Sequence, residues 1–323
     1  MSESILLSVE NLTKFYSSNN SKNVVRALDH VSFELPQNCT LGVVGESGCG
    51  KTTLGKCILN IVEPTEGKIR FRGEDISHLS QKEFRPYRKD IQVVFQNPHD
   101  ALNPRMKIRR LLMEPFTLWS EQKLTNQEIE EKSVKLLAKV GIDREILDQY
   151  PHQLSGGQLQ RISIALAIAN APSLIILDEP TTSLDAESSA ELLDLLIDLK
   201  EQIHNSYIFI SHDLHAVKDL CDFVAVMYLG RIVEIGSKQQ IFQNPRHPYT
   251  QALMGAMLSI SKSRDEIVEL TGEVPSPISL PKGCYFASRC PHAAEKCREA
   301  YPGRILLGDN SYVCCYRYQE SEE

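Results

Sequence analysis

Apolar residues in this chain of 323 residues occur in two patterns: short continuous runs and repeats at helical spacing. The runs at 41–44, 174–177 and 207–210 are continuously hydrophobic, which is typical of strands buried on both faces of a parallel sheet. Segment 52–61 carries apolar residues at helical spacing, and the alanine-rich segment 158–171 also predicts a helix. Strands that alternate with helices predict an α/β fold with a mostly parallel core.

Local signals add further elements. Residues 24–35 predict a strand after a polar loop at 17–23, and residues 223–235 predict a hairpin that turns at a glycine. The capping-box pattern at 125–128 opens a predicted helix, which stops at Gly141. Each of these segments therefore has a predicted start or end.

The same pattern suggests how the chain is organised. A mainly helical insert at 97–165 is expected to form its own lobe. The regular spacing of hydrophobic residues is lost at 259–265, where the composition changes. From residue 271 onward the chain is rich in Pro, Gly and Cys. We therefore predict a main domain at 1–260 and a C-terminal extension at 261–323.

Composition narrows the possible functions. With 42% hydrophobic and 24% charged residues the chain is typical of a soluble globular protein. The net charge of −7 does not favour binding to nucleic acid. The longest apolar stretches, such as 223–229, are far shorter than the ~20 residues that span a bilayer. The first residues lack the basic start and apolar run of a secretory signal. In a membrane process, another polypeptide would supply the membrane part.

A glycine-rich loop follows the predicted strand at 41–44 and precedes the predicted helix at 52–61. In this setting the pattern G-x-x-x-x-G-K-[ST] predicts a phosphate-binding loop, because backbone N–H groups and a helix N-terminus converge on phosphate oxygens. Lys51 is expected to reach the β- and γ-phosphates, and Thr52 to ligate Mg²⁺. The predicted nucleotide-binding residues here are Gly45, Glu46, Ser47, Gly48, Cys49, Gly50, Lys51, Thr52 and Thr53.

Acidic and polar side chains follow the buried strands. Asp178 and Glu179 come directly after the run at 174–177, so their carboxylates are expected beside the phosphates. Asp178 suits contact with the water shell of Mg²⁺, and Glu179 suits activation of the water that attacks the γ-phosphate. Gln96 and His212 each end another apolar strand. This order predicts an ATP-hydrolysing site.

A second anion site is predicted at 155–158, where Ser155, Gly156, Gly157 and Gln158 open a helix. The chain already has a loop for its own triphosphate. A second γ-phosphate sensor is therefore useful only if it serves the nucleotide of another subunit.

The sequences of these motifs and their order along the chain resemble those of the ATP-binding subunits of ABC transporters. From about residue 6 to 316 the chain is similar to one branch, the ATPases of dipeptide, oligopeptide and nickel importers, and most of all to their second or F-type subunit. Markers of this branch are the sequences at 95–98, 102–105, 150–153, 226–230, 244–253 and 272–277. The resemblance implies a RecA-like P-loop NTPase with an antiparallel β-subdomain, a helical subdomain and a Cys-rich C-terminal extension.

The resemblance also implies roles for single residues. Gln96 would touch Mg²⁺ and water, His212 would hold the γ-phosphate, and Tyr16 would stack on adenine, with Phe15 as its competitor. In the family, two ATPases pair head to tail around ATP. The phosphate loop of one faces the Ser-Gly-Gly-Gln segment of the other, and Asp185 would contact the partner across that seam.

The expected partners follow from the same resemblance. They are a second, non-identical ATPase, two transmembrane permease subunits and an extracellular binding protein, which places this chain at the cytoplasmic face of the membrane. The cargo stays open among peptides, nickel or nickel chelates, heme and sugars. One alternative is a non-transport ABC ATPase acting on ribosomes or DNA, but the chain has one ATPase core and no long coiled-coil or zinc insert. The other is an exporter ATPase, against which the Asn-Pro-Arg-His-Pro-Tyr sequence at 244–249 argues.

Five of the nine cysteines crowd the last forty residues, which in a reducing compartment favours metal over disulfides. The paired C-x₂-C knuckles of zinc ribbons are absent. Four thiolates on a loop-rich segment suit a [4Fe–4S] cluster, which the resemblance also implies. Zinc, or thiols packed without metal, stay as alternatives. The predicted ligands are Cys284, Cys290, Cys297 and Cys315, with Cys314 an open substitute for the last.

Overall fold

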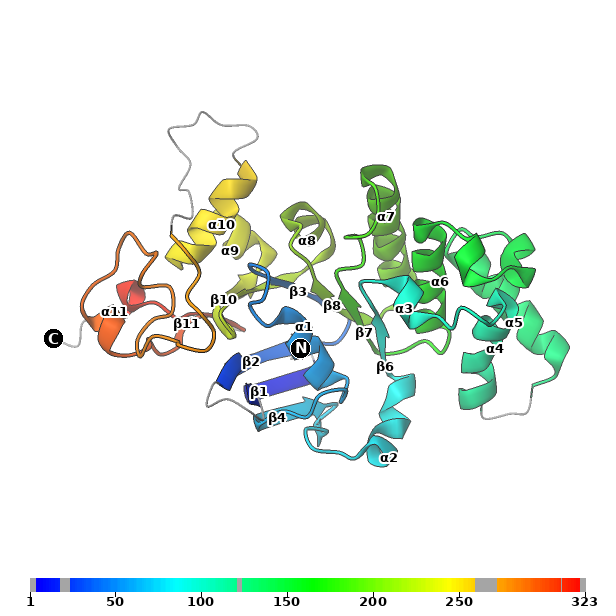
Figure 1. Ribbon diagram of the computed structural model, residues 1–323, viewed down its shortest axis with the longest axis horizontal. Coiled ribbons are helices and arrows are strands. Elements are labelled where there is room, and N and C mark those ends of the chain that lie inside the picture. The colour runs from blue at the N-terminus through cyan, green and yellow to red at the C-terminus, as the bar shows by residue number, and fades with distance from the viewer. Residues whose placement is uncertain (1–3, 18–23, 121–123, 259–271, 309, 320–323) are drawn as a thin grey trace. The chain divides into compact units, whose positions relative to one another are not determined.

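The computed structural model describes residues 4–17, 24–120, 124–258, 272–308 and 310–319, which form two compact units (Figure 1). The first unit contains the chain up to residue 79 and from residue 210 onward, and the second contains residues 80–209. Of the loop predicted at 17–23, Ser17 ends the strand that begins at Ile5, and residues 18–23 lie outside the described residues. The predicted change of hydrophobic pattern at 259–265 also lies outside them.

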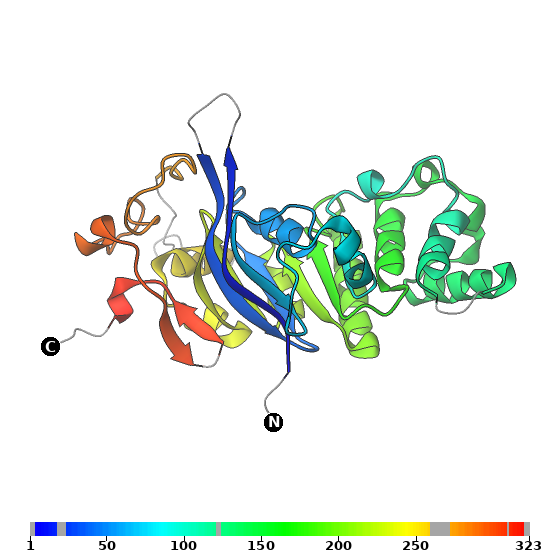
Figure 2. The same cartoon turned by 90° about the horizontal axis from the view of Figure 1, so that it is seen from below.

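An antiparallel sheet forms part of the first unit. Its strands follow the order β2-β1-β4-β5. The two long strands β1 and β2 lie side by side in Figure 2. The strands are β1 (Ile5–Ser17), β2 (Val24–Pro36), β4 (Glu66–Phe71) and β5 (Glu74–Asp75). The predicted strand at 24–35 and the antiparallel β-subdomain are thus confirmed.

A second sheet runs through the first unit in the order β11-β12-β10-β9-β3. Strand β3 pairs in parallel with β9, and β9 and β10 form the predicted hairpin. All five residues of β3 are buried, as the continuous apolar run predicts. The strands are β3 (Thr40–Val44), β9 (Phe223–Tyr228), β10 (Arg231–Ser237), β11 (Ile305–Gly308) and β12 (Ser311–Val313).

The first unit also contains helices. Helix α1 begins at Lys51, directly after the last glycine of the glycine-rich loop, and the yellow helices α9 and α10 follow β10 in the chain (Figure 1). They are α1 (Lys51–Ile58), α8 (Leu214–Leu220), α9 (Lys238–Gln243), α10 (Pro248–Leu258), α11 (Lys296–Glu299) and the 3₁₀ helix η5 (Tyr316–Tyr318).

The second unit combines three strands with the helical insert. The strand order is β8-β7-β6, and β6 pairs in parallel with β7. The strands are β6 (Ile91–Val94), β7 (Leu174–Asp178) and β8 (Ser206–Ile210). The helices are α2 (Gln81–Phe84), η1 (Arg85–Lys89), α3 (Pro98–Ala101), α4 (Ile108–Trp119), α5 (Asn126–Lys139), η2 (Arg144–Asp148), η3 (Pro151–Gln153), α6 (Gly156–Ile168) and α7 (Ala186–Ile203).

Helix starts in the second unit agree with the capping signals. The Thr125 hydroxyl accepts from the Glu128 N–H at 3.3 Å, and the Glu128 carboxylate accepts from the Thr125 N–H at 2.7 Å. This reciprocal cap satisfies two donors that the first turn of α5 would otherwise leave unpaired. The predicted helix at 158–171 is also confirmed, beginning at Gly156 and ending at Ile168.

A buried charge cluster ties the C-terminal segment to the sheets of the first unit. The Asp29 carboxylate is 2% exposed and accepts from Arg231 Nε at 2.9 Å and from the Tyr285 hydroxyl. Burial works to raise the pKa of Asp29, but the hydrogen bonds from Tyr285 and His30 and the charge of Arg231 outweigh it, so the pKa falls. Arg231 lies 3.9 Å from the centre of the Tyr301 ring. Residues from β2, β10 and the C-terminal segment thereby share one ionised network.

We predict that Arg231→Ala lowers the free energy of unfolding by about 3 kcal/mol, because it leaves the buried Asp29 charge without its cation. Arg70→Ala is the matched control, since Arg70 pairs with Glu10 at a partly exposed position where an ion pair contributes about 1 kcal/mol at most. Urea unfolding of both variants measures the difference. Equal losses would contradict the role assigned to Arg231.

Candidate nucleotide site and cysteine pocket

The glycine-rich loop connects β3 to α1 and lies against backbone carbonyls of neighbouring strands. A Cβ atom on Gly45 would lie 2.2 Å from the Met227 carbonyl oxygen, and one on Gly50 would lie 2.2 Å from the Ala27 carbonyl oxygen. Gly50 also has φ 107°, which favours glycine. Both positions therefore require glycine, and the predicted strand–loop–helix setting is confirmed.

Lys51 lies in the first turn of α1 and folds back over the loop. Its ammonium donates to the Gly45 carbonyl at 2.8 Å and to the Glu46 carbonyl at 3.2 Å. The first turn of α1 carries no acidic residue, so nothing there offsets the positive end of the helix dipole. Of the other predicted residues, Cys49 is buried, Ser47 and Gly48 are exposed, and Thr52 and Thr53 are half-buried. This arrangement suits an anion-binding loop.

Glu46, the second residue of the loop, makes a contact that the sequence did not predict. Its carboxylate accepts two hydrogen bonds from the Arg289 guanidinium, at 2.8 and 3.0 Å. Its backbone N–H donates to the Tyr249 hydroxyl at 3.0 Å. In the sequence, Arg289 stands out only as the neighbour of Cys290, and Tyr249 only as a member of the branch marker at 244–253. The contact spans 243 residues, so local patterns cannot reveal it.

Two further predicted residues lie in the first unit. Tyr16 is near the end of β1 with 40% of its surface exposed, and the Lys14 ammonium lies 5.1 Å from its ring centre. Phe15 faces the Arg26 guanidinium at 5.4 Å. His212 is exposed and lies two residues beyond β8, directly before Asp213, which caps α8. An exposed ring at Tyr16 is able to stack on a flat ligand.

The second unit brings three of the predicted polar residues to the ends of its strands. Gln96 follows β6, Asp178 ends β7, and Glu179 comes next with φ 49°. The Gln96 amide donates to Glu179 Oε2 at 3.2 Å, and the Thr182 hydroxyl donates to the same oxygen at 3.1 Å. A left-handed backbone at a non-glycine residue is strained, and such strain occurs often at functional sites. Glu179 is thus held by residues from two segments.

The Ser-Gly-Gly-Gln segment forms the N-terminus of α6. The Ser155 hydroxyl accepts from the Gln158 N–H at 3.3 Å, and the Gln158 side chain accepts from the Ser155 N–H at 3.0 Å. A groove of about 270 Å³ lies beside this turn, with Gly157 and Arg161 among its lining residues. Asp185 caps α7 next to the groove, and the N–H and hydroxyl of Ser188 lower the pKa of its carboxyl.

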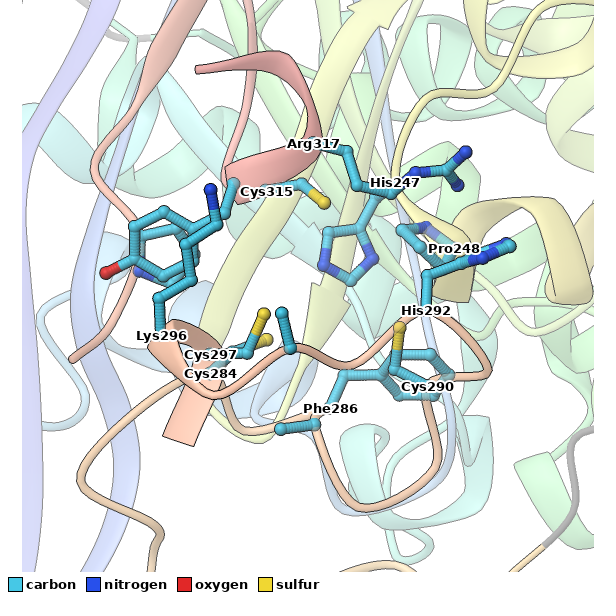
Figure 3. A pocket seen from close by; sticks show the side chains of 14 residues that line it. His247, Pro248, Cys284, Phe286, Cys290, His292, Lys296, Cys297, Cys315 and Arg317 are labelled. Atoms are coloured by element: carbon cyan, nitrogen blue, oxygen red, sulfur yellow. The ribbon is translucent and has the colours of Figure 1, made fainter. Parts of the chain in front are cut away.

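Four cysteines line one pocket of about 140 Å³ in the first unit (Figure 3). They are Cys284, Cys290, Cys297 and Cys315. Burial raises the pKa of the Cys284 thiol to about 12. Cys314 does not line this pocket, and its thiol donates instead to the Ile232 carbonyl at 3.6 Å. Within the described ranges, no group of three or more His, Cys, Asp or Glu side chains is arranged to hold a metal ion.

His247 lines the same pocket and was not predicted as a site residue (Figure 3). Its Nδ1 accepts from the Tyr249 N–H at 3.1 Å, so this nitrogen carries no proton. Burial lowers the pKa of the ring to about 3, which keeps the imidazole neutral. The Glu234 carboxylate accepts from the Arg246 and His247 N–H groups at 2.7 and 2.8 Å. The turn that carries His247 is therefore firmly held.

None of the helices in the described part of the chain is long and apolar enough to cross a membrane.

The phosphate loop, the acidic end of β7 and the Ser-Gly-Gly-Gln turn together define an ATPase of the ABC type. Comparisons with known proteins agree. The family profile for ABC transporters matches residues 28–182, and the profile for the oligopeptide/dipeptide transporter C-terminal region matches residues 233–297.

Relatives of known function cover nearly the whole chain. Dipeptide transport ATP-binding protein DppF of Haemophilus influenzae is 47% identical, over 90% of this chain and 89% of that protein. Oligopeptide transport ATP-binding protein AppF of Bacillus subtilis is 45% identical, over 91% and 90%. This chain belongs to the ABC transporter ATP-binding subunits, in the dipeptide and oligopeptide transporter branch.

Solved structures confirm the cassette fold. The dimeric post-hydrolysis state of the ATP-binding cassette MJ0796, bound to ADP and Pi, matches with a TM-score of 0.67 and 25% identity, over 72% of this chain and 99% of that one. The cbiO1 structure from Clostridium perfringens, part of an ABC transporter complex, gives 0.66 and 27%, over 82% and 98%. The α/β ABC fold and an ATP-hydrolysing activity are therefore established for this chain.

Proposed function

We propose that this chain supplies the ATP hydrolysis that drives import of dipeptides or oligopeptides. The observation that carries the proposal is the match to peptide-transport ATPases over about nine tenths of both chains. Nickel or a metal chelate is a related cargo of the same branch. The chain would work at the cytoplasmic face of the membrane, beneath two permease subunits that receive cargo from an extracellular binding protein.

The polar residues fit the chemistry of hydrolysis. Mg²⁺ prefers hard oxygen ligands, and Thr52, Gln96 and Asp178 offer a hydroxyl, an amide and a carboxylate. Mg²⁺, when bound, would neutralise charge on the phosphates. The loop 45–53 and Lys51 would bind the triphosphate, while Tyr16 would stack on the adenine ring.

Glu179 is the proposed general base. Gln96 and Thr182 both donate to its Oε2, which fixes the direction of the carboxylate. A fixed acceptor lowers the cost of orienting the attacking water and takes up its proton. His212 would hold the γ-phosphate during the same step.

We predict that Glu179→Gln lowers the rate of ATP hydrolysis at least 100-fold while ATP still binds, because the amide cannot take the proton from water. Lys51→Ala is the contrasting variant and should abolish ATP binding itself, since it removes the cation that reaches the phosphates. Phosphate release and equilibrium binding of ATP separate the two effects. A Glu179 variant with the parent turnover would rule out the base assignment.

The turn at 155–158 would serve the ATP of a second ATPase. Its N–H groups open helix α6 beside a groove lined by Ser155, Gly157 and Gln158, which suits a phosphate oxygen from outside the chain. Asp185 caps the next helix at the rim of this surface and would contact the partner. The partner is proposed to be a non-identical ATPase of the same branch.

We predict that Ser155→Arg prevents ATP-dependent pairing with the second ATPase, because the long side chain fills the groove. The isolated chain should keep its own ATP affinity within about twofold. Sedimentation of the Glu179→Gln chain with its partner, with and without the change at Ser155, measures pairing. Unchanged association would show that the groove does not form the seam.

We further propose that the cysteine pocket holds a [4Fe–4S] cluster. Such clusters are bound by four thiolates, and four cysteines line this one pocket. Phe286 and Pro248 contribute apolar surface to it, which limits the access of water. Cys315 belongs to the set because it lines the pocket, whereas Cys314 contacts β10. The cluster would be structural or redox-regulatory, and zinc is the alternative metal.

We predict that anaerobically purified protein contains about four iron and four sulfide per chain. Cys290→Ser should lose most of this iron, and Cys314→Ser, the matched control, should keep it. Iron and acid-labile sulfide assays with visible absorption provide the measurement. Colourless protein with stoichiometric zinc would reject the iron–sulfur proposal, and metal-free protein would reject both metals.

A further inference from the structure

Arg289 connects the C-terminal segment to the phosphate loop through a paired contact. Its Nη1 lies 2.8 Å from Glu46 Oε2, and its Nη2 lies 3.0 Å from Glu46 Oε1. The Arg289 side chain is only 4% exposed. Parallel hydrogen bonds between a guanidinium and a carboxylate are strong and fix the orientation of both groups. The position of Glu46 is therefore set by a residue of the C-terminal segment.

Two tyrosine hydroxyl groups form hydrogen bonds with Arg289 and Glu46. Arg289 Nη1 also donates to the Tyr228 hydroxyl at 3.3 Å, and the Glu46 N–H donates to the Tyr249 hydroxyl. The rings of Tyr228, Tyr249 and Phe286 pack on one another, with centres 4.7 to 5.4 Å apart. These packed rings hold the Arg289 guanidinium in a fixed position.

The turn that carries Arg289 is itself anchored in the cysteine pocket. The Arg289 N–H donates to the Phe286 carbonyl at 3.0 Å, and the Ala287 N–H donates to the Cys284 carbonyl at the same distance. Cys284 and Cys290 bound this turn, and both line the pocket. The fold of the C-terminal segment thus determines whether the guanidinium reaches the loop.

Glu46 is the only acidic residue among the nine residues 45–53. A carboxylate in this loop repels the phosphates that the loop must gather, and partial burial strengthens the repulsion. The Arg289 guanidinium cancels that charge and keeps the carboxylate bound on its own side. We propose that Arg289 is a positioning residue for nucleotide binding, so that the C-terminal segment forms part of the ATP site of this chain. The inference rests on the proposed binding of ATP at the phosphate loop and does not depend on a metal in the cysteine pocket.

The test measures Mg²⁺-ATP affinity of the full chain by calorimetry, beginning with the parent protein. Arg289→Ala should raise Kd about tenfold, a change of ~1.4 kcal/mol, because Glu46 then faces the phosphates with its charge uncompensated. Adding Glu46→Gln to this variant should return Kd to within about threefold of the parent. Arg298→Ala, which removes an exposed arginine of the same segment, should leave Kd unchanged. A parent protein that binds no ATP would overturn the proposed function and, with it, the role assigned to Arg289.

Steady-state hydrolysis distinguishes positioning from general support of the fold. Arg289→Ala should raise KM for ATP about as much as Kd while kcat stays within about twofold. A parent-like Kd in folded Arg289→Ala protein would overturn the proposal. So would a raised Kd that Glu46→Gln fails to recover, because the loss would then not come from the uncompensated carboxylate. Thermal melting of each variant shows that the protein is folded.

Discussion

The close approach of two backbone carbonyls to Gly45 and Gly50 is the constraint on which the first unit depends. With no Cβ in the way, the loop lies directly against Ala27 of β2 and Met227 of β9. The Gly230 N–H then donates to the Cys49 carbonyl, and the Gly230 carbonyl accepts from the Asp29 N–H, both at 2.9 Å. The phosphate loop is thus hydrogen-bonded to the β9–β10 turn, which in turn is bonded to β2. Packing between strands therefore fixes the glycines of the loop, while Ser47 and Gly48 stay exposed, where a polyanion can reach them.

Several strands, one helix start and the strand-end residues of the site could be predicted, because each depends on the sequence of a short segment. The buried runs gave strands β3, β7 and β8, and the capping box at 125–128 gave the start of α5. Gln96 and Glu179 were both expected at the ends of their strands. Parallel strands place their carboxyl ends at one edge, so their hydrogen bond across 83 residues follows from the topology.

Other contacts could not be predicted, because they depend on packing between distant segments. Nothing near Arg289 in the sequence indicates that it pairs with Glu46, nor does the sequence around Tyr285 indicate that it donates to Asp29. Neighbouring cysteines 314 and 315 look equivalent in the sequence. They differ in the fold because Cys314 faces β10 and Cys315 faces the pocket. The predicted boundary at 260/261 stays a prediction, while the C-terminal segment contributes β11 and β12 to the sheet of the first unit.

The pairing of β12 with β10 has a consequence for the solubility of the chain. Glu234 and Ile235 of β10 pair with Val313 and Tyr312, so β10 has neighbours on both sides. Without β12, an apolar strand would present its unpaired N–H and C=O groups to any other unsatisfied strand, the usual route to edge-to-edge aggregation. With β12 present, the sheet ends instead in the four-residue strand β11, which is too short to be a good template. We therefore expect β11 and β12 to protect the molecule from aggregating with its own copies, whatever the neighbouring cysteines bind.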